Sequence, residues 1–226
     1  MNLLAVETST ELCSVALLRD DALFVEEVLA GNRHSELLVP MIRKVLERAR
    51  LEPARMDAFA FGQGPGSFTG IRIACGIVQG LAFASGRPVV PVPSLLALAE
   101  QSNETRVVAA LDARMDEAYL AAYARSGDDW NEVIAPRLVD AASAPELPAR
   151  GWTATGNGFV RLPWLREAYR ERVEMRLDGD LPRAGAVARL AARRFVRGGA
   201  IAAERAAPLY LRDKVAQTTE ERRARR

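Results

Sequence analysis

A glycine-rich turn carries the most specific chemical signal in this sequence. The run at 62–72 reads Gly-Gln-Gly-Pro-Gly-Ser-Phe-Thr-Gly-Ile-Arg and separates a short apolar stretch from a long one. Gly64 and Gly66 allow backbone angles that other residues avoid, and Ser67 or Thr69 could cap the helix that follows. Backbone N–H groups left free at a helix N-terminus suit an anion or a carbonyl. The alternative is a connection shaped by packing alone, because a lone glycine-rich turn is a weak motif.

A second polar cluster interrupts the apolar N-terminus at Glu7, Thr8 and Ser9. A carboxylate and neighbouring hydroxyls could face a metal ion or phosphates. The structural alternatives are a strand-end carboxylate that pairs with a nearby donor, and hydroxyls that satisfy backbone groups in a turn. The two polar clusters together define a predicted nucleotide or anion site made of Glu7, Thr8, Ser9, Gly64, Gly66 and Ser67.

Groups suited to metal or nucleophilic catalysis are scarce. The chain has one histidine, His34, near the start of an expected helix, where a capping or surface role is usual. A Ser-His-Asp arrangement would need His34 beside a serine such as Ser67, and the sequence does not place them together. Cys13 and Cys75 are far apart in apolar surroundings, which indicates buried, reduced thiols. We therefore predict no catalytic residue and no metal site in this chain.

The composition favours a soluble cytoplasmic protein with a substantial core. The chain has 226 residues, 49% of them apolar, and a net charge of +2, which is too small to indicate a nucleic-acid surface by itself. The N-terminus lacks the basic and apolar regions of a signal peptide. No run of eighteen uncharged apolar residues is present, so we expect no membrane-spanning helix.

The hydrophobic pattern predicts an α/β protein with two related halves. In the first half it predicts three strands, a helix from near Asn32 to before Pro53, and a strand–turn–helix unit around the glycine-rich run. A polar stretch near Gln101 separates this half from a second series of strands and helices. The predicted units are a first lobe at 1–102, a smaller second lobe at 103–207, and a C-terminal segment at 208–226. The last segment could return to the first lobe and ends in a frayed basic tail.

The same pattern sets the expected bounds of the individual elements. The strands are expected at 2–6, 13–18, 22–29, 58–61, 89–92, 107–111, 118–123, 133–138 and 152–155. The helices are expected at 35–50, 94–101, 162–172 and 184–196, and one further helix is expected to begin at residue 69.

Two helices of the first half are predicted to form a contact surface. The helix after the glycine-rich turn is apolar around most of its circumference and must be covered on all sides. The helix at 35–50 is its expected neighbour, and an apolar stripe left exposed on such a pair marks an interaction site. The alternative is an internal core with no exposed patch. The predicted contact residues are Leu38, Met41, Ile42, Val45, Ile73, Ile77, Gly80, Leu81 and Ala84.

Several segments together resemble a known family. The residues at 3–10 and 13–17 resemble the first hairpin of the actin, Hsp70 and sugar-kinase superfamily. The glycine-rich run, Gly86-Arg87-Pro88 and the segment at 208–212 narrow the resemblance to the TsaB (YeaZ) family, which is paralogous to TsaD. The resemblance is densest over residues 1–100. It implies two degenerate actin-like, ribonuclease H-like lobes, each a mixed sheet with packed helices.

The resemblance also implies a function. Proteins of this family are accessory subunits of the complex that transfers a threonylcarbamoyl group to adenosine of tRNA, and they stabilise and position TsaD. The implied partners are TsaD and TsaE, with tRNA reached indirectly, no membrane, and a homodimer possible in isolation. No cofactor is expected for the isolated chain, whereas ATP is possible in the complex. The two contact helices are implied to pack on their counterparts in TsaD or in a second copy.

Two departures from the superfamily argue against independent chemistry. Glu7 stands where related proteins carry an Asp that helps to hold a metal and phosphates. Two metal-binding histidines of TsaD align with Ser94 and Leu98, and a leucine cannot ligate a metal. A nucleotide-binding kinase or switch remains the alternative, with Gly156-Asn157-Gly158 and the region around Asp112 as second-lobe phosphate loops. A peptidase is a third alternative, which the missing ligands oppose.

Overall fold

The computed structural model describes residues 1–176 and 179–212 and contains two five-stranded mixed sheets. The predicted basic tail lies outside the described residues. In the first sheet the strand order is β3-β2-β1-β4-β5, in which β1, β2 and β3 run antiparallel and β1, β4 and β5 run parallel. The strands are β1 (Asn2–Glu7), β2 (Leu12–Arg19), β3 (Ala22–Leu29), β4 (Ala58–Gly62) and β5 (Val89–Val92).

The second sheet repeats this topology. Its order, β10-β9-β6-β7-β8, has the same antiparallel meander of three strands joined to a parallel pair. The predicted two-lobed α/β fold is therefore confirmed, including the repetition between the halves. The strands are β6 (Arg106–Asp112), β7 (Ala118–Ser126), β8 (Asp129–Val139), β9 (Trp152–Thr155) and β10 (Val173–Met175).

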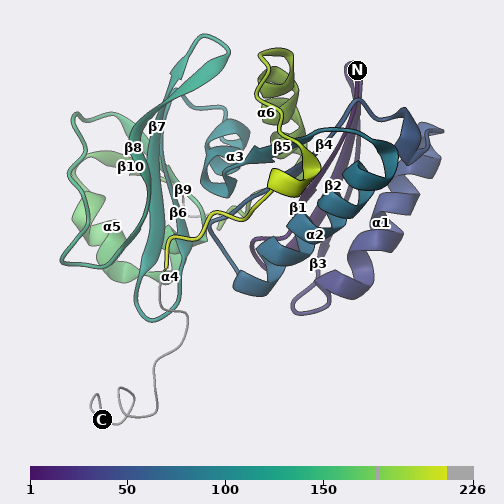
Figure 1. Cartoon of the computed structure of the whole chain (residues 1–226). Coiled ribbons are helices and arrows are strands. Elements are labelled where there is room, and N and C mark those ends of the chain that lie inside the picture. The colour runs from purple at the N-terminus through teal and green to yellow at the C-terminus, as the bar shows by residue number, and fades with distance from the viewer. Residues whose placement is uncertain (177–178, 213–226) are drawn as a thin grey trace.

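Helices separate the layers of the molecule (Figure 1). Two helices, α1 and α2, cover the outer face of the first sheet, and α4 and α5 cover the outer face of the second. Between the sheets lie α3 and α6, which pack on each other. The helices are α1 (His34–Ala49), α2 (Phe68–Ser85), α3 (Ser94–Gln101), α4 (Asn157–Arg161), α5 (Pro163–Tyr169) and α6 (Ala184–Val196), with short 3-10 turns at Pro53–Arg55 and Ala203–Arg205.

The alternation of side chains in β1 explains why this strand is apolar throughout. Leu4 and Val6 belong to the core under α1 and α2, whereas Leu3 and Ala5 face the core under α6. A strand covered by helices on both faces needs no polar side, so the N-terminus reads as a continuous apolar run. The same arrangement places the polar residues after β1 at the end of a rigid central strand.

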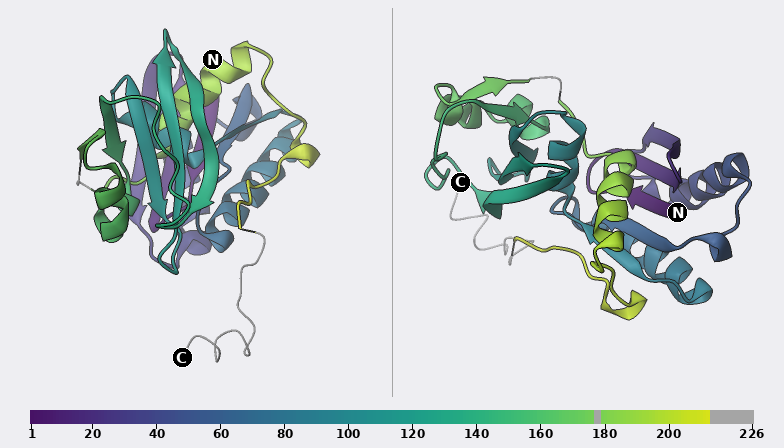
Figure 2. Two further views of the ribbon diagram at one scale, coloured as in Figure 1. Left: turned by 90° about the vertical axis from the view of Figure 1, so that its left-hand side faces the viewer. Right: turned by 90° about the horizontal axis from the view of Figure 1, so that it is seen from above.

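The position of α6 corrects the predicted division of the chain. This helix, assigned from the sequence to the second lobe, packs on β1, β2, β4 and β5 of the first sheet. Seen from above, it lies against the first lobe on the side that faces the second (Figure 2). Ile201 then pairs with Val89 at the edge of the first sheet. The second lobe in the structural sense therefore ends before α6, because the first sheet offers the apolar face that α6 needs.

Three local predictions also need correction. The helix expected from Asn32 begins at His34, because Arg33 and not Asn32 holds the N-cap position and no side chain caps the helix. The helix expected at 162–172 is present but shorter, as α5 at Pro163–Tyr169, and the short helix α4 at Asn157–Arg161 that precedes it was not predicted. The three-residue strand β10 was not predicted, because so short a segment has no visible periodicity.

Among the helices of the described residues, α2 alone is long and apolar enough to cross a membrane by length and composition. Its mean hydropathy is 1.4 over Phe68–Ser85, but the segment contains Arg72 and is therefore not an uncharged apolar run, and helices of a protein core pass the same test. One side of α2 packs on β4, and 33% of the segment is buried. The helix thus covers a sheet with one side, while much of its other side is exposed.

Candidate functional site

The glycine-rich turn joins β4 to α2 and packs tightly against the residues that follow β1. Ser67 caps α2, because its Oγ accepts a hydrogen bond from the Gly70 N–H at 3.3 Å. A Cβ on Gly70 would lie 1.9 Å from the Thr8 carbonyl oxygen, and one on Gly66 would lie 2.3 Å from that of Ser9. The glycines at these positions therefore permit a close approach of two backbones, which was the structural alternative.

The carboxylate of Glu7 is sealed inside the first lobe. It is 0% exposed, and it accepts hydrogen bonds from the Ser9 N–H at 2.6 Å and the Ser94 hydroxyl at 2.8 Å. Burial raises the pKa of the Glu7 carboxyl, while hydrogen bonds from Ser9 and Ser94 oppose this rise. Thr8 is equally buried and donates to the Gly70 carbonyl at 2.8 Å. In this structure Glu7 and Thr8 support the turn, which corrects their prediction as ligand-binding residues.

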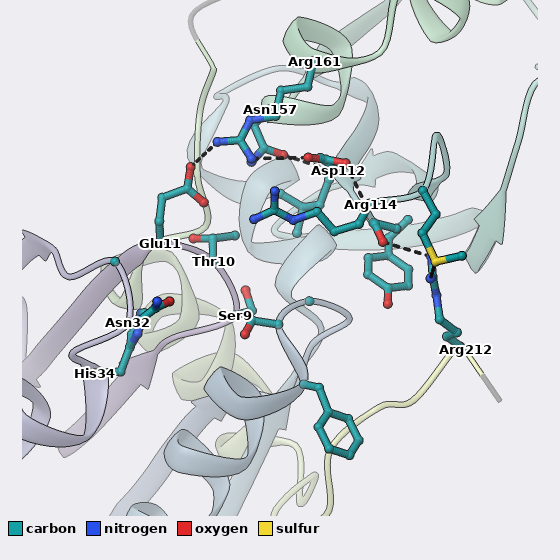
Figure 3. A pocket seen from close by; sticks show the side chains of 18 residues that line it. Ser9, Thr10, Glu11, Asn32, His34, Asp112, Arg114, Asn157, Arg161 and Arg212 are labelled. Atoms are coloured by element: carbon teal, nitrogen blue, oxygen red, sulfur yellow. Dashed lines mark hydrogen bonds and ion pairs between the residues drawn. The ribbon is translucent and has the colours of Figure 1, made fainter. Parts of the chain in front are cut away.

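A cleft between the lobes collects the remaining candidates. It has a volume of about 680 Å³, and its walls come from both halves of the chain (Figure 3). Ser9, Gly66 and Ser67 of the predicted anion site line it, whereas the buried Gly64 does not. On the opposite wall, the Asn157 side-chain oxygen accepts a hydrogen bond from the Asp112 N–H at 3.0 Å. The two second-lobe segments proposed from sequence thus meet in the same cleft.

Three cleft residues were not identified from the sequence. Arg161 on α4 pairs with Glu11 of the first lobe at 2.6 Å and with Asp112 of the second at 3.3 Å. Arg212 donates to the Ala113 carbonyl at 2.9 Å. His34, expected in a capping or surface role, is only 6% exposed and lines the cleft. Arginines distributed over separate elements leave no local pattern, so no sequence signal could have shown that they meet.

The predicted contact surface divides into a buried half and an exposed half. Leu38, Met41, Ile42 and Val45 on α1 are buried in the chain's own core, from 0% to 9% exposed, which corrects their prediction as residues open to a partner. The outward face of α1 is instead polar and charged, with Arg43, Lys44, Glu47 and Arg48 exposed.

The outward face of α2 is apolar and open. Ile73, Ile77 and Leu81 are partly exposed. Between them, a Cβ built on Gly76 or Gly80 would meet no atom within 4 Å. Phe83 near the end of the helix is 81% exposed. An apolar face of this kind on a charged protein surface is typical of an interaction site.

The two cysteines are unsuited to nucleophilic chemistry. Cys13 and Cys75 are buried free thiols. Burial, together with the nearby Glu7 charge, raises the pKa of the Cys13 thiol to about 11, and burial also raises the pKa of Cys75. Both thiols are therefore protonated at neutral pH, and a thiol is a far weaker nucleophile than a thiolate.

Comparison with known proteins agrees with this architecture. A TsaB protein of Escherichia coli, named a tRNA threonylcarbamoyladenosine biosynthesis protein, is 35% identical over 228 aligned positions that cover 96% of each chain. The TsaB protein of Haemophilus influenzae is 38% identical over 95% of each chain. The chain belongs to the TsaB family. Residues 27–161 also match the family described as TsaD, tRNA N6-adenosine threonylcarbamoyltransferase.

Solved structures support the same assignment. YeaZ from Pseudomonas aeruginosa superimposes with a TM-score of 0.80 and 38% identity over 93% of this chain and 99% of that one. A second structure, of a Pseudomonas aeruginosa protein with similarity to peptidase YEAZ, gives a TM-score of 0.83 at the same identity and coverage. The resemblance inferred from the sequence motifs is therefore confirmed along nearly the whole chain.

Proposed function

We propose that this TsaB-family chain is a non-catalytic subunit in the biosynthesis of threonylcarbamoyladenosine in tRNA. Relatives that share 35% and 38% of its sequence are named for this pathway, and they are matched along almost their full length. In this role the chain stabilises and positions TsaD, which carries out the transfer. The observation that carries the proposal is the open apolar face of α2.

The residues at the positions of the TsaD histidines support a role without metal chemistry. Ser94 and Leu98 are both 0% exposed. The Ser94 hydroxyl donates to Glu7, and Leu98 belongs to the core between the sheets. These positions therefore serve the interior of the first lobe, and the chemistry falls to the partner.

The shape of α2 fits a helix of a partner protein. Thr69, Gly76, Gly80 and Ala84 are exposed along one side of the helix, and the small residues leave room for a second helix to approach closely. Partly exposed Ile73 and Ile77 lie beside this row and offer apolar area. Burying such area on association contributes roughly 25 cal/mol per Å² before the cost of immobilising the partners. The proposed occupant is TsaD in the complex, or a second copy of this chain in isolation.

The other components of the proposal are those that the family resemblance implies. In the proposal TsaE binds the pair formed with TsaD, and tRNA is reached through the complex. ATP, where it is needed, is bound by the assembly.

The decisive variant is Gly80→Arg. A side chain at this position points into open space, and arginine has a higher helix propensity than glycine, so the variant is expected to fold at least as stably as the parent. Its long charged side chain would stand on the proposed contact face. Co-purification with TsaD and a reconstituted modification reaction should therefore both fail, while the unfolding temperature does not fall.

A matched control is Ala141→Arg, at an exposed position of the second lobe. This variant adds the same side chain away from α2 and should bind TsaD normally. Normal binding and modification by Gly80→Arg would contradict the proposed surface. Full-rate modification in a reaction that lacks this protein would contradict the proposed function itself.

A further inference from the structure

The C-terminal part of the described chain crosses from the first lobe to the second. Residues 206–212 leave the 3-10 turn beside α2 and end at the turn between β6 and β7, as the yellow trace in Figure 1 shows. No helix or strand occurs within residues 206–212, which we call the strap. Because the strap has no regular secondary structure of its own, its position depends on the contacts that it makes with the two lobes.

The first part of the strap is bound to the first lobe through its backbone. The Gln79 side chain on α2 donates a hydrogen bond to the Ala206 carbonyl at 3.0 Å. Further along, the Leu209 N–H donates to the Gln63 carbonyl, beside the glycine-rich turn, at 2.7 Å. The strap therefore follows α2 toward its N-terminus before it leaves the first lobe.

A stacked cluster holds Tyr210 against the first turn of α2. The Tyr210 hydroxyl accepts a hydrogen bond from the Arg72 Nε at 2.7 Å. The guanidinium carbon of Arg72 lies 3.6 Å from the centre of the Phe68 ring and 5.5 Å from that of the Tyr210 ring. A cation over an aromatic face is attracted to it, but the attraction is modest where the groups are exposed, and Tyr210 is 46% exposed. This part of the strap is therefore ordered by contacts that can open at low cost.

Arg212 joins the strap to the second lobe (Figure 3). Its guanidinium donates to the Ala113 carbonyl at 2.9 Å, to the Glu117 carboxylate at 2.5 Å and to the Met115 sulfur at 3.0 Å. The side chain of Arg212 is only 14% exposed, and hydrogen bonds between charged groups are stronger than neutral ones. One side chain thus connects the strap to three successive parts of a single turn.

The turn that Arg212 contacts has an unusual backbone. Arg114, Met115 and Asp116 have φ values of 64°, 59° and 61°, all in the left-handed region that residues other than glycine rarely adopt. Such a backbone persists only where the surrounding contacts fix it. Arg212 supplies contacts of this kind before, within and after the left-handed residues. The anchor and the turn therefore stabilise each other.

The strap crosses between the lobes where the cleft separates them. One apolar core extends over α3, α6 and the facing sides of both sheets, so a relative motion of the lobes must be a rotation about this core. Arg212 and Phe68 line the cleft, away from the shared core. The ion pair between Arg161 and Glu11 also spans the cleft, but both side chains are more than a third exposed, and such pairs contribute little.

We propose that the strap is a releasable tie that fixes the second lobe relative to the first and opens at Arg212. While Arg212 is bound to the turn between β6 and β7, the separation of the lobes across the cleft is fixed. When Arg212 dissociates, the second lobe rotates about the shared core and the cleft changes its width. The tie is internal to this chain, so it does not depend on the docking assigned to α2.

The test measures the distance between the lobes in the full-length protein by pulsed electron paramagnetic resonance. Spin labels are attached to Glu47→Cys on α1 and Ala168→Cys on α5, which are exposed positions on helices of different lobes. Both native cysteines are buried, and protein without the introduced cysteines gives the background. The labelled parent should give one narrow distance distribution.

Arg212→Leu should add a broad second population of distances. The loss of charged hydrogen bonds should raise the ratio of detached to attached molecules about tenfold or more. The matched control is Arg205→Leu, just before the strap, where the side chain is exposed and makes no hydrogen bond or ion pair with the described residues. This control should keep the narrow distribution of the parent.

Tyr210→Ala tests the other end of the strap. It removes a contact with the first lobe, so broadening in this variant cannot come from damage to the turn between β6 and β7. We expect a smaller second population than in Arg212→Leu. The double variant should behave like Arg212→Leu by itself, because both changes act through one strap. Tyr210 is half exposed, so Tyr210→Ala keeps the test decisive if Arg212→Leu is unstable.

Four outcomes would overturn the proposal. The first is a parent distribution as broad as that of Arg212→Leu. The second is a narrow distribution in both Arg212→Leu and Tyr210→Ala. The third is equal broadening in Arg205→Leu, and the fourth is a double variant whose detached population exceeds that of Arg212→Leu in proportion to the effect of Tyr210→Ala. A failure here leaves the docking on α2 unaffected, since that is tested by binding to TsaD.

Discussion

The two helices on the outer face of the first sheet have similar lengths, but their outward sides differ in polarity. On α1 the apolar residues lie on one side, which is sealed against the sheet, and the outward side is charged. On α2 the inner side is just as tightly packed, but the outward side is also apolar and stays open. An apolar stripe on a helix therefore identifies a core contact, and only apolar residues in excess of that stripe indicate a partner.

The largest effect is expected from the inner side of α2. In Gly70→Ala the new Cβ would lie 1.9 Å from the Thr8 carbonyl, so the backbones must separate. We expect a loss of about 3 kcal/mol or more in the free energy of unfolding, measured by urea denaturation. The matched control is Gly80→Ala on the outer side, which should gain about 0.5–1 kcal/mol because no atom opposes the new methyl group. Equal changes in the free energy of unfolding for Gly70→Ala and Gly80→Ala would contradict the difference in packing between the inner and outer sides of α2.

The sealed side of α1 should respond almost as strongly. Leu38 is 0% exposed in the core under the first sheet, so Leu38→Ala should cost about 3 kcal/mol of stability through the cavity that it leaves. Its neighbour Val39 is 46% exposed, and Val39→Ala should cost less than about 0.5 kcal/mol. Chemical denaturation of both variants measures the contrast. A stable Leu38→Ala protein that fails to bind TsaD would restore the original interpretation of α1 as a docking helix.

The raised pKa of the buried Glu7 carboxyl predicts that the stability of the folded protein depends on pH. Because the pKa of its carboxyl is raised in the folded protein, the folded state holds this proton more tightly than the unfolded state. The contribution of Glu7 is therefore most favourable below its ordinary pKa of 4.5 and declines as the pH rises toward the raised value.

The matching variant is Glu7→Gln, which cannot lose a proton. The difference in stability between the parent and this variant should change with pH above 4.5, with a slope of at most about 1.4 kcal/mol per pH unit. Denaturation curves at several pH values measure it. Parallel pH profiles of the two proteins would show that Glu7 has no raised pKa.

The smallest effect on stability is expected at the open side of α2. Phe83 is 81% exposed, so Phe83→Ala should change the free energy of unfolding by less than about 0.5 kcal/mol. The same change should weaken association with TsaD, because a large apolar side chain near a contact surface contributes to binding. Parallel unfolding and binding measurements separate the two effects. A variant that binds as tightly as the parent would place the contact closer to the N-terminal part of the helix.

Much of the fold could be predicted from local patterns. The bounds of β5, α3, β9 and α6 agree with the sequence prediction, because each is a compact apolar segment between polar or proline-containing turns. Local patterns could not predict whether the apolar side of α1 is buried in the chain's own core. Its apolar stripe is compatible with a core or with a partner, and only the position of the sheet beneath it distinguishes them.

The residues of the cleft show more clearly what local sequence patterns cannot predict. Ser67 and Asp112 could be found because each follows a strand or ends one, where polar residues of an α/β protein often gather. Arg161 and Arg212 come from a short helix and from the C-terminal segment, and they reach the cleft only because the chain crosses between the lobes. Their contribution depends on long-range contacts that no local pattern records.

The amino-acid sequence by itself determined the repeated α/β architecture and the family, since periodicity and the turn at 62–72 are local properties of the chain. The tertiary structure decided which polar and apolar groups remain available. It sealed Glu7, buried the apolar side of α1, left the outward side of α2 open and brought His34 to the cleft. The physical reason is that burial is a property of the whole packing arrangement, so identical side chains become core or surface according to what lies opposite them.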